Sequence, residues 1–166
     1  GMPLLSVVII TFNEEKNIER CLQSVQKIAD EVVVVDSFSN DKTQEICQKY
    51  LVRFVQHAFE GHIQQKNYAA SLANYDYVLS LDADEVLSNE LQASILKAKQ
   101  GFAQQGYYMH RLNNYCGQWI KHGGWYPDKK LRLWNRHAGA WGGTNPHDEW
   151  KLFDSKSSIG FLSGDL

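Results

Sequence analysis

The sequence predicts an α/β fold built on a largely parallel sheet. Short apolar runs, typical of strands buried on both faces, alternate with segments of helical periodicity over the first hundred residues. The 166 residues, 43% of them apolar, suit one globular core, and no repeat or low-complexity linker divides them. We therefore expect a single domain over residues 2–166.

The first strand and the helix after it follow from local pattern. Residues 4–11 form a mainly apolar run, and Asn13 is expected to cap the next helix, with Glu14 and Glu15 in its first turn. Apolar residues then recur at spacings of three and four, which predicts one buried helix face at Ile18, Cys21, Leu22, Val25, Ile28 and Ala29.

The same alternation continues to about residue 100. Three further apolar runs predict strands at 32–36, 52–56 and 77–81. A helix is expected at 64–73, the polar turn 39–41 leads into a shorter one, and Ser88 is expected to cap a fourth. The inward residues of the two helices after polar turns are expected to be Ile46, Cys47 and Tyr50 in the first, and Leu91, Ile95 and Leu96 in the second.

Composition changes after Gly101. All five Trp residues lie in this half, together with Gly pairs at 123–124 and 142–143. Strand-like segments at 107–112 and 131–134 predict antiparallel strands and long loops built onto the first sheet. The Trp side chains offer flat apolar surfaces of the kind on which sugar rings pack, with core positions as the alternative.

Charge and hydropathy exclude several classes. A formal charge of −2 argues against general nucleic-acid binding. The aliphatic runs 7–10 and 32–35 are far shorter than the roughly 20 residues that a membrane span requires. No signal peptide is visible, so a cytoplasmic protein is expected. The three cysteines lack metal-ligand spacing and are expected to be buried and reduced, at Cys21, Cys47 and Cys116.

Polar clusters follow three of the predicted strands, at 11–14, 36–37 and 82–85. Ligands of open α/β sheets bind beyond the carboxyl ends of the strands, so these clusters are expected to converge on one edge. Asp82 and Asp84, two residues apart, can approach one hard cation such as Mg²⁺ or Mn²⁺ and a diphosphate. A solvated acidic turn ahead of Ser88 is the alternative.

Two other single residues are candidates for a nucleotide site. Asp36 ends a strand, where its carboxylate can accept a hydrogen bond from a nucleobase imide N–H, or serve as an ordinary turn residue. Lys66 can reach a phosphate as a point charge, or lie on a helix surface.

Ionisable residues also gather late in the chain. Residues 142–150 are expected to form a Gly/Pro-rich loop that can present a carboxylate, Asp148 or Glu149, to a hydroxyl as general base. A metal site with His147 and a solvated turn are the alternatives. A basic segment can attract a phosphorylated or acidic acceptor, or be a plain surface: Lys121, Lys129, Lys130, Arg132 and Arg136.

Three motifs in register resemble the family 2 glycosyltransferases of the GT-A fold. They are the segments at 6–15, 32–43 and 81–85. The segment 129–136, followed by His147 and Asp148, is similar to a bacterial subgroup that includes lipopolysaccharide-core β-1,4-glucosyltransferases. The resemblance covers about residues 4–150.

The resemblance implies an inverting transfer of a sugar from a nucleotide-diphosphate donor, with a UDP-sugar favoured, to a saccharide or lipid-linked acceptor of the cell envelope. It implies a divalent cation, Mg²⁺ or Mn²⁺, at Asp82 and Asp84, and Asp148 as general base with Glu149 as the adjacent alternative. The implied donor site consists of Thr11, Asn13, Glu14, Asp36, Lys66 and Asp82.

By the same resemblance, residues 2–100 are the nucleotide-binding half and residues 101–166 the acceptor-side half. Relatives continue for several tens of residues beyond Leu166, often with a membrane-facing segment, so the acceptor half is expected to be shortened and the inner face of the cytoplasmic membrane is a further expected location. The family motif Asp-Asp-Gly-Ser is Asp36-Ser37-Phe38-Ser39 here. Two alternatives remain. One is a non-catalytic nucleotide- or carbohydrate-binding module, and the other is a metal-dependent phosphatase or nucleotidyltransferase that uses Asp82, Asp84 and His147.

Overall fold

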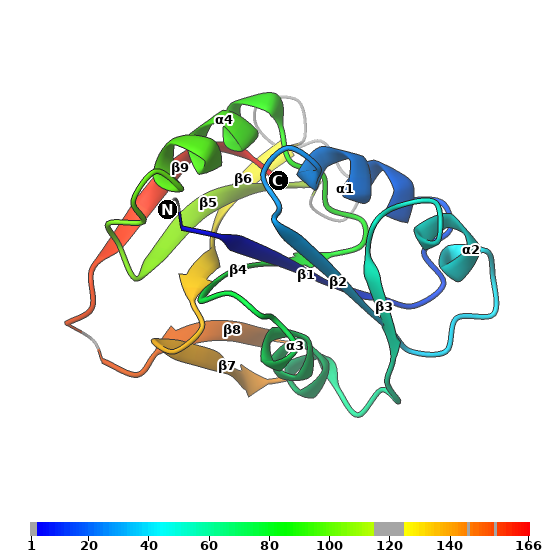
Figure 1. Cartoon of the computed structure of the whole chain (residues 1–166). Helices are drawn as coiled ribbons and strands as arrows, with labels where there is room; N and C mark the ends of the chain where they lie inside the picture. Colours follow the sequence, from blue (N-terminus) through cyan, green and yellow to red (C-terminus); the bar gives the residue numbers. More distant parts are fainter. Residues whose placement is uncertain (1–2, 115–124, 146, 155) are drawn as a thin grey trace.

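A seven-stranded sheet forms the centre of the structure, a computed structural model that describes residues 3–114, 125–145, 147–154 and 156–166 (Figure 1). The strand order is β3-β2-β1-β4-β6-β5-β9. Its strands are β1 (Leu5–Thr11), β2 (Glu31–Asp36), β3 (Arg53–Gln56), β4 (Tyr77–Asp82), β5 (Gly106–Asn114), β6 (Trp125–Asn135) and β9 (Ile159–Asp165). A separate hairpin consists of β7 (Gly139–Thr144) and β8 (His147–Leu152).

Strand direction divides the sheet into two halves. β1 pairs in parallel with β2 and β4, and β2 pairs in parallel with β3, which confirms the four strands predicted from apolar runs. β6 is antiparallel to β4 and to β5, whereas β9 is parallel to β5. The expected aromatic-rich antiparallel part is therefore confirmed, and it continues the parallel sheet through the pairing of β4 with β6.

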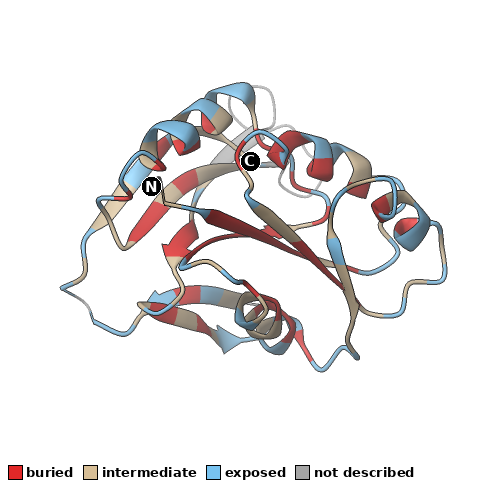
Figure 2. Cartoon of the chain, viewed as in Figure 1, coloured by how far each residue is buried: buried red, intermediate tan, exposed pale blue. Residues whose placement is uncertain are grey.

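Helices cover both faces of the sheet. They are α1 (Ile18–Val25), α2 (Thr43–Cys47), α3 (His62–Ser71) and α4 (Asn89–Ala98). α1 and α4 lie on one face, and α3 lies on the other beside the β7–β8 hairpin (Figure 1). Along β1, Val7 and Ile9 pack in the core of the first face, whereas Val8 packs with Ala69 of α3 in the core of the second. Burial on both faces explains why the central strands β1 and β4 are mainly apolar (Figure 2).

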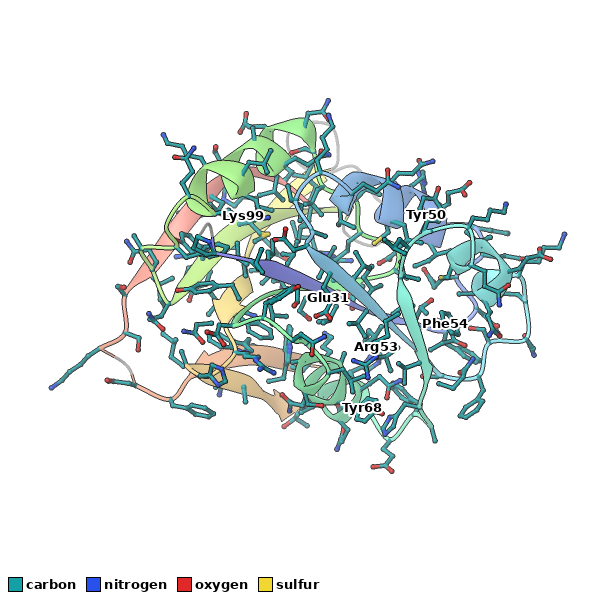
Figure 3. The ribbon with its side chains drawn as sticks, in the orientation of Figure 1. Glu31, Tyr50, Arg53, Phe54, Tyr68 and Lys99 are labelled. Carbon is teal, nitrogen blue, oxygen red and sulfur yellow. The ribbon has the colours of Figure 1, made fainter. Side chains whose placement is uncertain are left out.

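Polar side chains close the edge of the sheet at the amino ends of β1 and β2. Lys99 Nζ donates to the Ile28 carbonyl at 2.9 Å and to Asp30 Oδ2 at 2.7 Å (Figure 3). The Glu31 carboxylate accepts hydrogen bonds from Ser6 Oγ at 2.7 Å and from the Asn74 N–H at 2.8 Å. Lys99 and Glu31 therefore both have partners within the protein at this end of the sheet.

The expected helix cap at Asn13 is wrong. α1 begins at Ile18, and Asn13 lies in the loop before it with a positive φ of 50°, a conformation that a short polar side chain tolerates. Asn13 Oδ1 accepts a hydrogen bond from the Asn40 N–H at 2.9 Å, and the Asn13 N–H donates to Ser39 Oγ at 2.8 Å. Asn13 therefore joins the β1–α1 loop to the β2–α2 loop instead of starting a helix.

Burial of single residues tests two further predictions. Leu96 is 40% exposed, so the buried face of α4 consists of Leu91 and Ile95, and the prediction for Leu96 is wrong. Cys21 and Cys47 are buried and free, as expected, and burial raises the pKa of both thiols. Cys116 lies outside the described residues. None of the helices in the described residues is long and apolar enough to cross a membrane.

The predicted cap at Ser88 is confirmed, and it has a second function. Ser88 Oγ accepts the Leu91 N–H at 3.1 Å and also the Asp165 N–H of β9 at 3.0 Å. We expect Ser88→Ala to lower the free energy of unfolding by about 1–2 kcal/mol, because it leaves two N–H groups without this acceptor. Urea denaturation measures the change.

Ser71→Ala is the matched control for this substitution. Ser71 is exposed, and its hydroxyl donates locally to the Tyr68 carbonyl, so its loss is expected to change stability by less than about 0.5 kcal/mol. Equal effects of the two variants would show that the Ser88 hydroxyl does not hold β9 to α4.

Candidate active site

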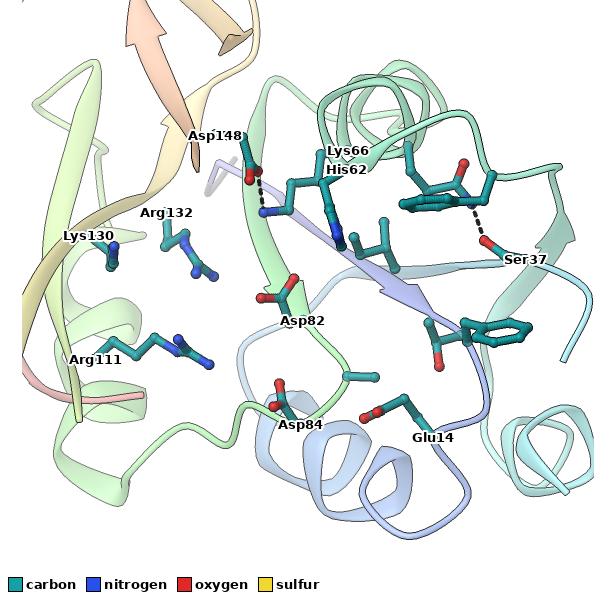
Figure 4. Close-up of a pocket in the computed structure, with 16 residues that line it drawn as sticks. Glu14, Ser37, His62, Lys66, Asp82, Asp84, Arg111, Lys130, Arg132 and Asp148 are labelled. Atoms are coloured by element: carbon teal, nitrogen blue, oxygen red, sulfur yellow. Dashed lines mark hydrogen bonds and ion pairs between the residues drawn. The ribbon is translucent and has the colours of Figure 1, made fainter. Parts of the chain in front are cut away.

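A cleft of about 450 Å³ lies at the carboxyl end of β1 and β4 (Figure 4). The strand register explains its position, because Thr11 pairs with Asp36 and Ile10 pairs with Asp82, so three strands end at one level. The lining residues are Ile10, Thr11, Phe12, Glu14, Ser37, Phe59, His62, Gln65, Lys66, Asp82, Ala83, Asp84, Arg111, Lys130, Arg132 and Asp148. The predicted convergence of the three clusters is confirmed, although not every member faces the cleft.

The turn after β4 presents two carboxylates to the cleft. Asp82 and Asp84 both line it, and Glu14 lies across from them (Figure 4). Burial raises the pKa of Glu14, and the nearby charges of Asp84 and Asp82 raise it further. Negative charge is thus concentrated here, and oxygen ligands of this kind suit a hard divalent cation. No group of three or more metal-ligating side chains occurs in the described part of the chain, so further ligands would have to come from a bound phosphate or water.

A buried carboxylate beneath the turn holds it in place. Glu85 Oε1 accepts the Asp82 N–H at 2.7 Å and an Arg132 N–H at 2.6 Å, while Glu85 Oε2 lies 2.7 Å from Arg111 Nε. Arg132 also donates to the Ser80 carbonyl at 3.3 Å. Burial alone would lower the pKa of Arg132, but the charges of Glu85 and Asp82 outweigh it and raise that pKa. The Arg132 guanidinium consequently stays charged at the cleft wall.

The nucleotide residues implied by the resemblance divide into two groups. Thr11 and Glu14 line the cleft, and Thr11 Oγ1 is buried with no hydrogen-bond partner among the described residues. Asn13 and Asp36 do not line it. The Asp36 carboxylate is fully buried and accepts hydrogen bonds from the N–H and the hydroxyl of Ser39. Its contact with a nucleobase would require that carboxylate to exchange partners.

Residues 142–150 are not the expected loop, because most of them belong to the β7–β8 hairpin. Gly139 permits the close packing, since a Cβ at this position would lie 2.6 Å from the Trp150 ring. Trp150 in turn stacks on Trp134 of β6 with the ring centroids 4.7 Å apart. Burial of Trp141 and Trp150 anchors the hairpin beside α3, so these residues are part of the core rather than an open sugar platform.

Strand geometry separates the two candidate bases. Asp148 lines the cleft, and its Oδ2 lies 2.6 Å from Lys66 Nζ of α3. Burial raises the pKa of Asp148, but the hydrogen bond and charge of Lys66 outweigh it and lower that pKa overall. Glu149, one residue on, is 70% exposed, lies 3.5 Å from Lys151 Nζ, and borders a neighbouring cavity of about 130 Å³ instead. The side chain of His147 lies outside the described residues.

Several cleft residues were not singled out for a role from the sequence. Arg111, His62 and Phe59 line the cleft, and no local pattern marks them. In the basic segment, Lys130 and Arg132 line the cleft, whereas Lys129 Nζ lies over the Tyr108 ring, 4.2 Å from the ring centroid. Phe12 and Phe59 line the cleft and are 56% and 52% exposed, so their rings are open to a ligand there.

Comparison with known sequences identifies the family. Residues 6–150 match the model of Glycosyl transferase family 2. The chain belongs to glycosyl transferase family 2. The resemblance found in the three motifs is therefore confirmed, and the chain has the mixed α/β architecture expected of the family.

Two curated relatives are similar to part of this chain. It is 46% identical over 91 residues to an uncharacterized glycosyltransferase of Rickettsia bellii (strain RML369-C), which covers 55% of this chain and 31% of that protein. It is 34% identical over 93 residues to the lipopolysaccharide core biosynthesis glycosyltransferase LpsC of Rhizobium meliloti (strain 1021), which covers 53% of this chain and 34% of that protein. The chain thus spans about a third of the length of the curated relatives it matches.

Solved structures agree with the GT-A fold. Glucosyl-3-phosphoglycerate synthase of Mycobacterium tuberculosis, in complex with Mn²⁺, UDP and phosphoglyceric acid, superposes with a TM-score of 0.69 at 15% identity over 99% of this chain and 69% of that chain. S. aureus TarS 1–349 in complex with UDP superposes with a TM-score of 0.52 at 26% identity over 72% of this chain and 38% of that chain.

The Glu85 network leads to a stability prediction. Glu85→Gln is expected to lower the free energy of unfolding by about 3–5 kcal/mol, because it leaves the buried Arg132 guanidinium without its counter-charge. Combined with Arg132→Met, the loss is expected to be smaller than the sum of the two single losses by about 1 kcal/mol or more. A urea-denaturation double-mutant cycle measures this coupling, and strictly additive losses would contradict it.

Proposed function

We propose that this chain is an inverting, metal-dependent glycosyltransferase that transfers a sugar from a nucleotide-diphosphate donor, a UDP-sugar, to a hydroxyl of a cell-envelope saccharide such as lipopolysaccharide core. One observation carries the proposal. A single cleft contains a carboxylate pair on a fixed turn, a buried lysine, and a separate carboxylate on the opposite wall. Donor activation and acceptor deprotonation need these groups within one cleft.

The donor nucleotide is proposed to lie along the ends of β1 and β2. Thr11 Oγ1 supplies a hydroxyl without a partner among the described residues, and the exposed rings of Phe12 and Phe59 offer faces for a base. S. aureus TarS, a structural neighbour at 26% identity, binds UDP, which supports uracil as the base. Asn13 acts indirectly in this proposal, through its hydrogen bond with the Asn40 N–H.

A divalent cation, Mg²⁺ or Mn²⁺, would be held by Asp82 and Asp84. A bound cation supplies charge stabilisation for the departing diphosphate. The residues fit that role, since both carboxylates face the cleft and the Glu85 contact to the Asp82 N–H fixes the turn that carries them. The ammonium of Lys66, on the same cleft, adds a point charge for the diphosphate.

Asp148 is the proposed general base, and it belongs to the acceptor-side half at residues 101–166. It borders the main cleft, whereas Glu149 projects toward solvent and Lys151. In a single displacement, Asp148 takes the proton of the acceptor hydroxyl as that oxygen attacks the sugar from the side opposite the diphosphate.

The acceptor is proposed to approach from the β5–β6 side. Lys130 lines this side and suits an acceptor that carries a phosphate or a carboxylate. The relative LpsC is a lipopolysaccharide core biosynthesis glycosyltransferase, which supports a saccharide of that class. Residues 2–100 would then bind the donor, and residues 101–166 would contribute the acceptor wall.

Nucleotide binding tests the donor site. We expect UDP to bind more tightly than GDP, CDP or dTDP in calorimetric titrations, and only with Mn²⁺ present, because cation and diphosphate share Asp82 and Asp84. Asp82→Asn/Asp84→Asn is expected to abolish the Mn²⁺-dependent part. Equal binding of UDP by this variant and by the wild type would contradict the metal site.

Sugar transfer tests the base. Asp148→Asn is expected to lower kcat by about 100- to 10,000-fold with the KM for donor little changed, because it removes proton transfer in the transition state. Glu149→Gln, the same chemical change one residue away on the opposite face, is expected to leave kcat nearly unchanged. Transfer from a UDP-sugar to lipopolysaccharide core saccharides measures both. Tight UDP binding without transfer to any acceptor would instead favour a binding module.

A further inference from the structure

We propose that Lys66 is a positioning residue that couples the two substrates: it holds Asp148 before the donor binds, and it transfers to the donor diphosphate afterwards, which frees Asp148 to act as base. The inference rests on the proposed function of this same cleft. It assigns to one lysine the order in which the site becomes competent, with donor first and acceptor second.

The contact between the two residues is close and dry. Lys66 Nζ lies 2.6 Å from Asp148 Oδ2, and the two side chains are only 9% and 6% exposed. The same ammonium lies 4.3 Å from the centroid of the Trp141 ring. A carboxylate held in this way has its charge neutralised by a partner and binds a proton weakly. In this arrangement Asp148 is a poor general base.

The pair is not needed to dock the hairpin on α3. Asn67, the next residue of α3, accepts the Trp141 N–H at 3.0 Å and donates to the Trp141 carbonyl at 3.1 Å. Asn145 Oδ1 accepts the Ile63 N–H at 3.0 Å. These neutral hydrogen bonds and the buried Trp side chains already join the hairpin to the helix. A buried ion pair adds little stability over apolar side chains of similar volume, so its presence here calls for a functional explanation.

The donor offers Lys66 a stronger partner within reach of the same cleft. Lys66 lines the cleft together with Asp82 and Asp84, where the diphosphate is proposed to bind (Figure 4). A diphosphate carries more negative charge than one carboxylate, so it competes for the ammonium. Once Lys66 has moved, Asp148 is left with less counter-charge in a poorly solvated position, and its affinity for a proton rises.

Other charges also face Asp148 and must be separated from Lys66. His62 of α3 lines the cleft beside it, Arg132 and Lys130 of β6 lie on the adjoining wall, and Asp82 of β4 lies across from it. The other charged residues of β8 with described side chains are Glu149 and Lys151, which pair with each other. Arg132 is held by Glu85, so Lys66 is the cation whose partner the donor is expected to change. An imidazole can also exchange a proton, so His62 needs its own control.

Sugar transfer then takes place in a single displacement. The acceptor oxygen forms a bond to the anomeric carbon while its proton moves to the Asp148 carboxylate. The bond between that carbon and the diphosphate oxygen breaks, and its electron pair leaves with the diphosphate, which Lys66 now contacts. One residue thus favours departure of the leaving group and releases the base in the same movement.

Proton uptake on donor binding tests the inference without any acceptor. UDP-glucose is titrated at saturating Mn²⁺ and about pH 5, in two buffers of different ionisation enthalpy, so that the protons bound per donor are measured. A nucleotide sugar lacks the terminal phosphate group that titrates at about pH 6. The protons taken up on binding are therefore bound by the protein. We expect the wild type to take up roughly half a proton or more, because Asp148 loses Lys66. Asp148→Asn is expected to take up none of this fraction.

Variants at two other positions assign the effect. Lys66→Met is expected to lose the uptake, because its Asp148 is without the lysine in both states, whereas Lys66→Arg, which pairs with either anion, is expected to keep it. His62→Gln is expected to keep it as well. Melting temperatures check that each variant is folded, and Lys66→Met/Asp148→Asn serves if the single Asp148→Asn chain does not fold.

The outcomes separate this inference from the donor proposal. UDP-glucose binding with equal proton uptake in the wild type and the Asp148 variants would overturn the role of Lys66 and leave the donor site intact. Loss of uptake in His62→Gln would assign the proton to His62 and overturn it too. Failure of the wild type to bind either UDP or UDP-glucose would remove the donor proposal, and this inference would fall with it.

Discussion

The buried carboxylate of Glu85 is the contact on which the rest of the site depends. Three elements meet on it: the turn after β4 through the Asp82 N–H, β6 through Arg132, and β5 through Arg111. An unpaired carboxylate at this depth would be costly, so these contacts are needed together rather than singly. Their consequence is geometric. The parallel half, which carries Asp82 and Asp84, is held in a fixed relation to the antiparallel half, which carries the cationic wall.

The same logic applies on the other face of the sheet, with apolar contacts in place of charge. Trp150 stacks on Trp134 of β6, and the main chain of Trp141 exchanges two hydrogen bonds with Asn67 of α3. The hairpin is thereby fixed against both the sheet and the helix. Asp148, on the strand between these anchors, has little freedom to move, whereas the long Lys66 side chain has several rotatable bonds. Movement within the Lys66–Asp148 pair is therefore expected of the lysine.

Local pattern was enough to predict the elements whose burial repeats along the chain. The strands β1, β2 and β4 are mainly apolar on both faces, and the Ser88 cap forms with a residue three positions away, so short windows of sequence contain the signal. The family motifs lie at and after strand ends, which is why Thr11, Glu14, Asp82 and Asp84 reach one cleft. Helix α3 adds Lys66 to it, and β8 adds Asp148.

The wrong predictions have physical causes that a short window of sequence does not contain. Asn13 bonds to Asn40 of the β2–α2 loop and so does not cap α1. Residues 142–150 belong mostly to a hairpin rather than a loop, because the Gly residues hide the alternation that buries Trp141 and Trp150. Nothing in the residues around Arg111 predicts its place in the cleft, because its partner Glu85 lies in the distant loop between β4 and α4.

Charge balance in the cleft explains why such distant pairings matter for function. Its lining includes four carboxylates, at Glu14, Asp82, Asp84 and Asp148, and four cationic side chains, at Lys66, Arg111, Lys130 and Arg132. Two of the cations are already committed to Glu85, and a third is paired with Asp148. A diphosphate carries more charge than the remaining Lys130 can balance, so its binding calls for a new cation or a change of partners. A metal ion at the aspartates meets the first need, and the release of Lys66 from Asp148 meets the second.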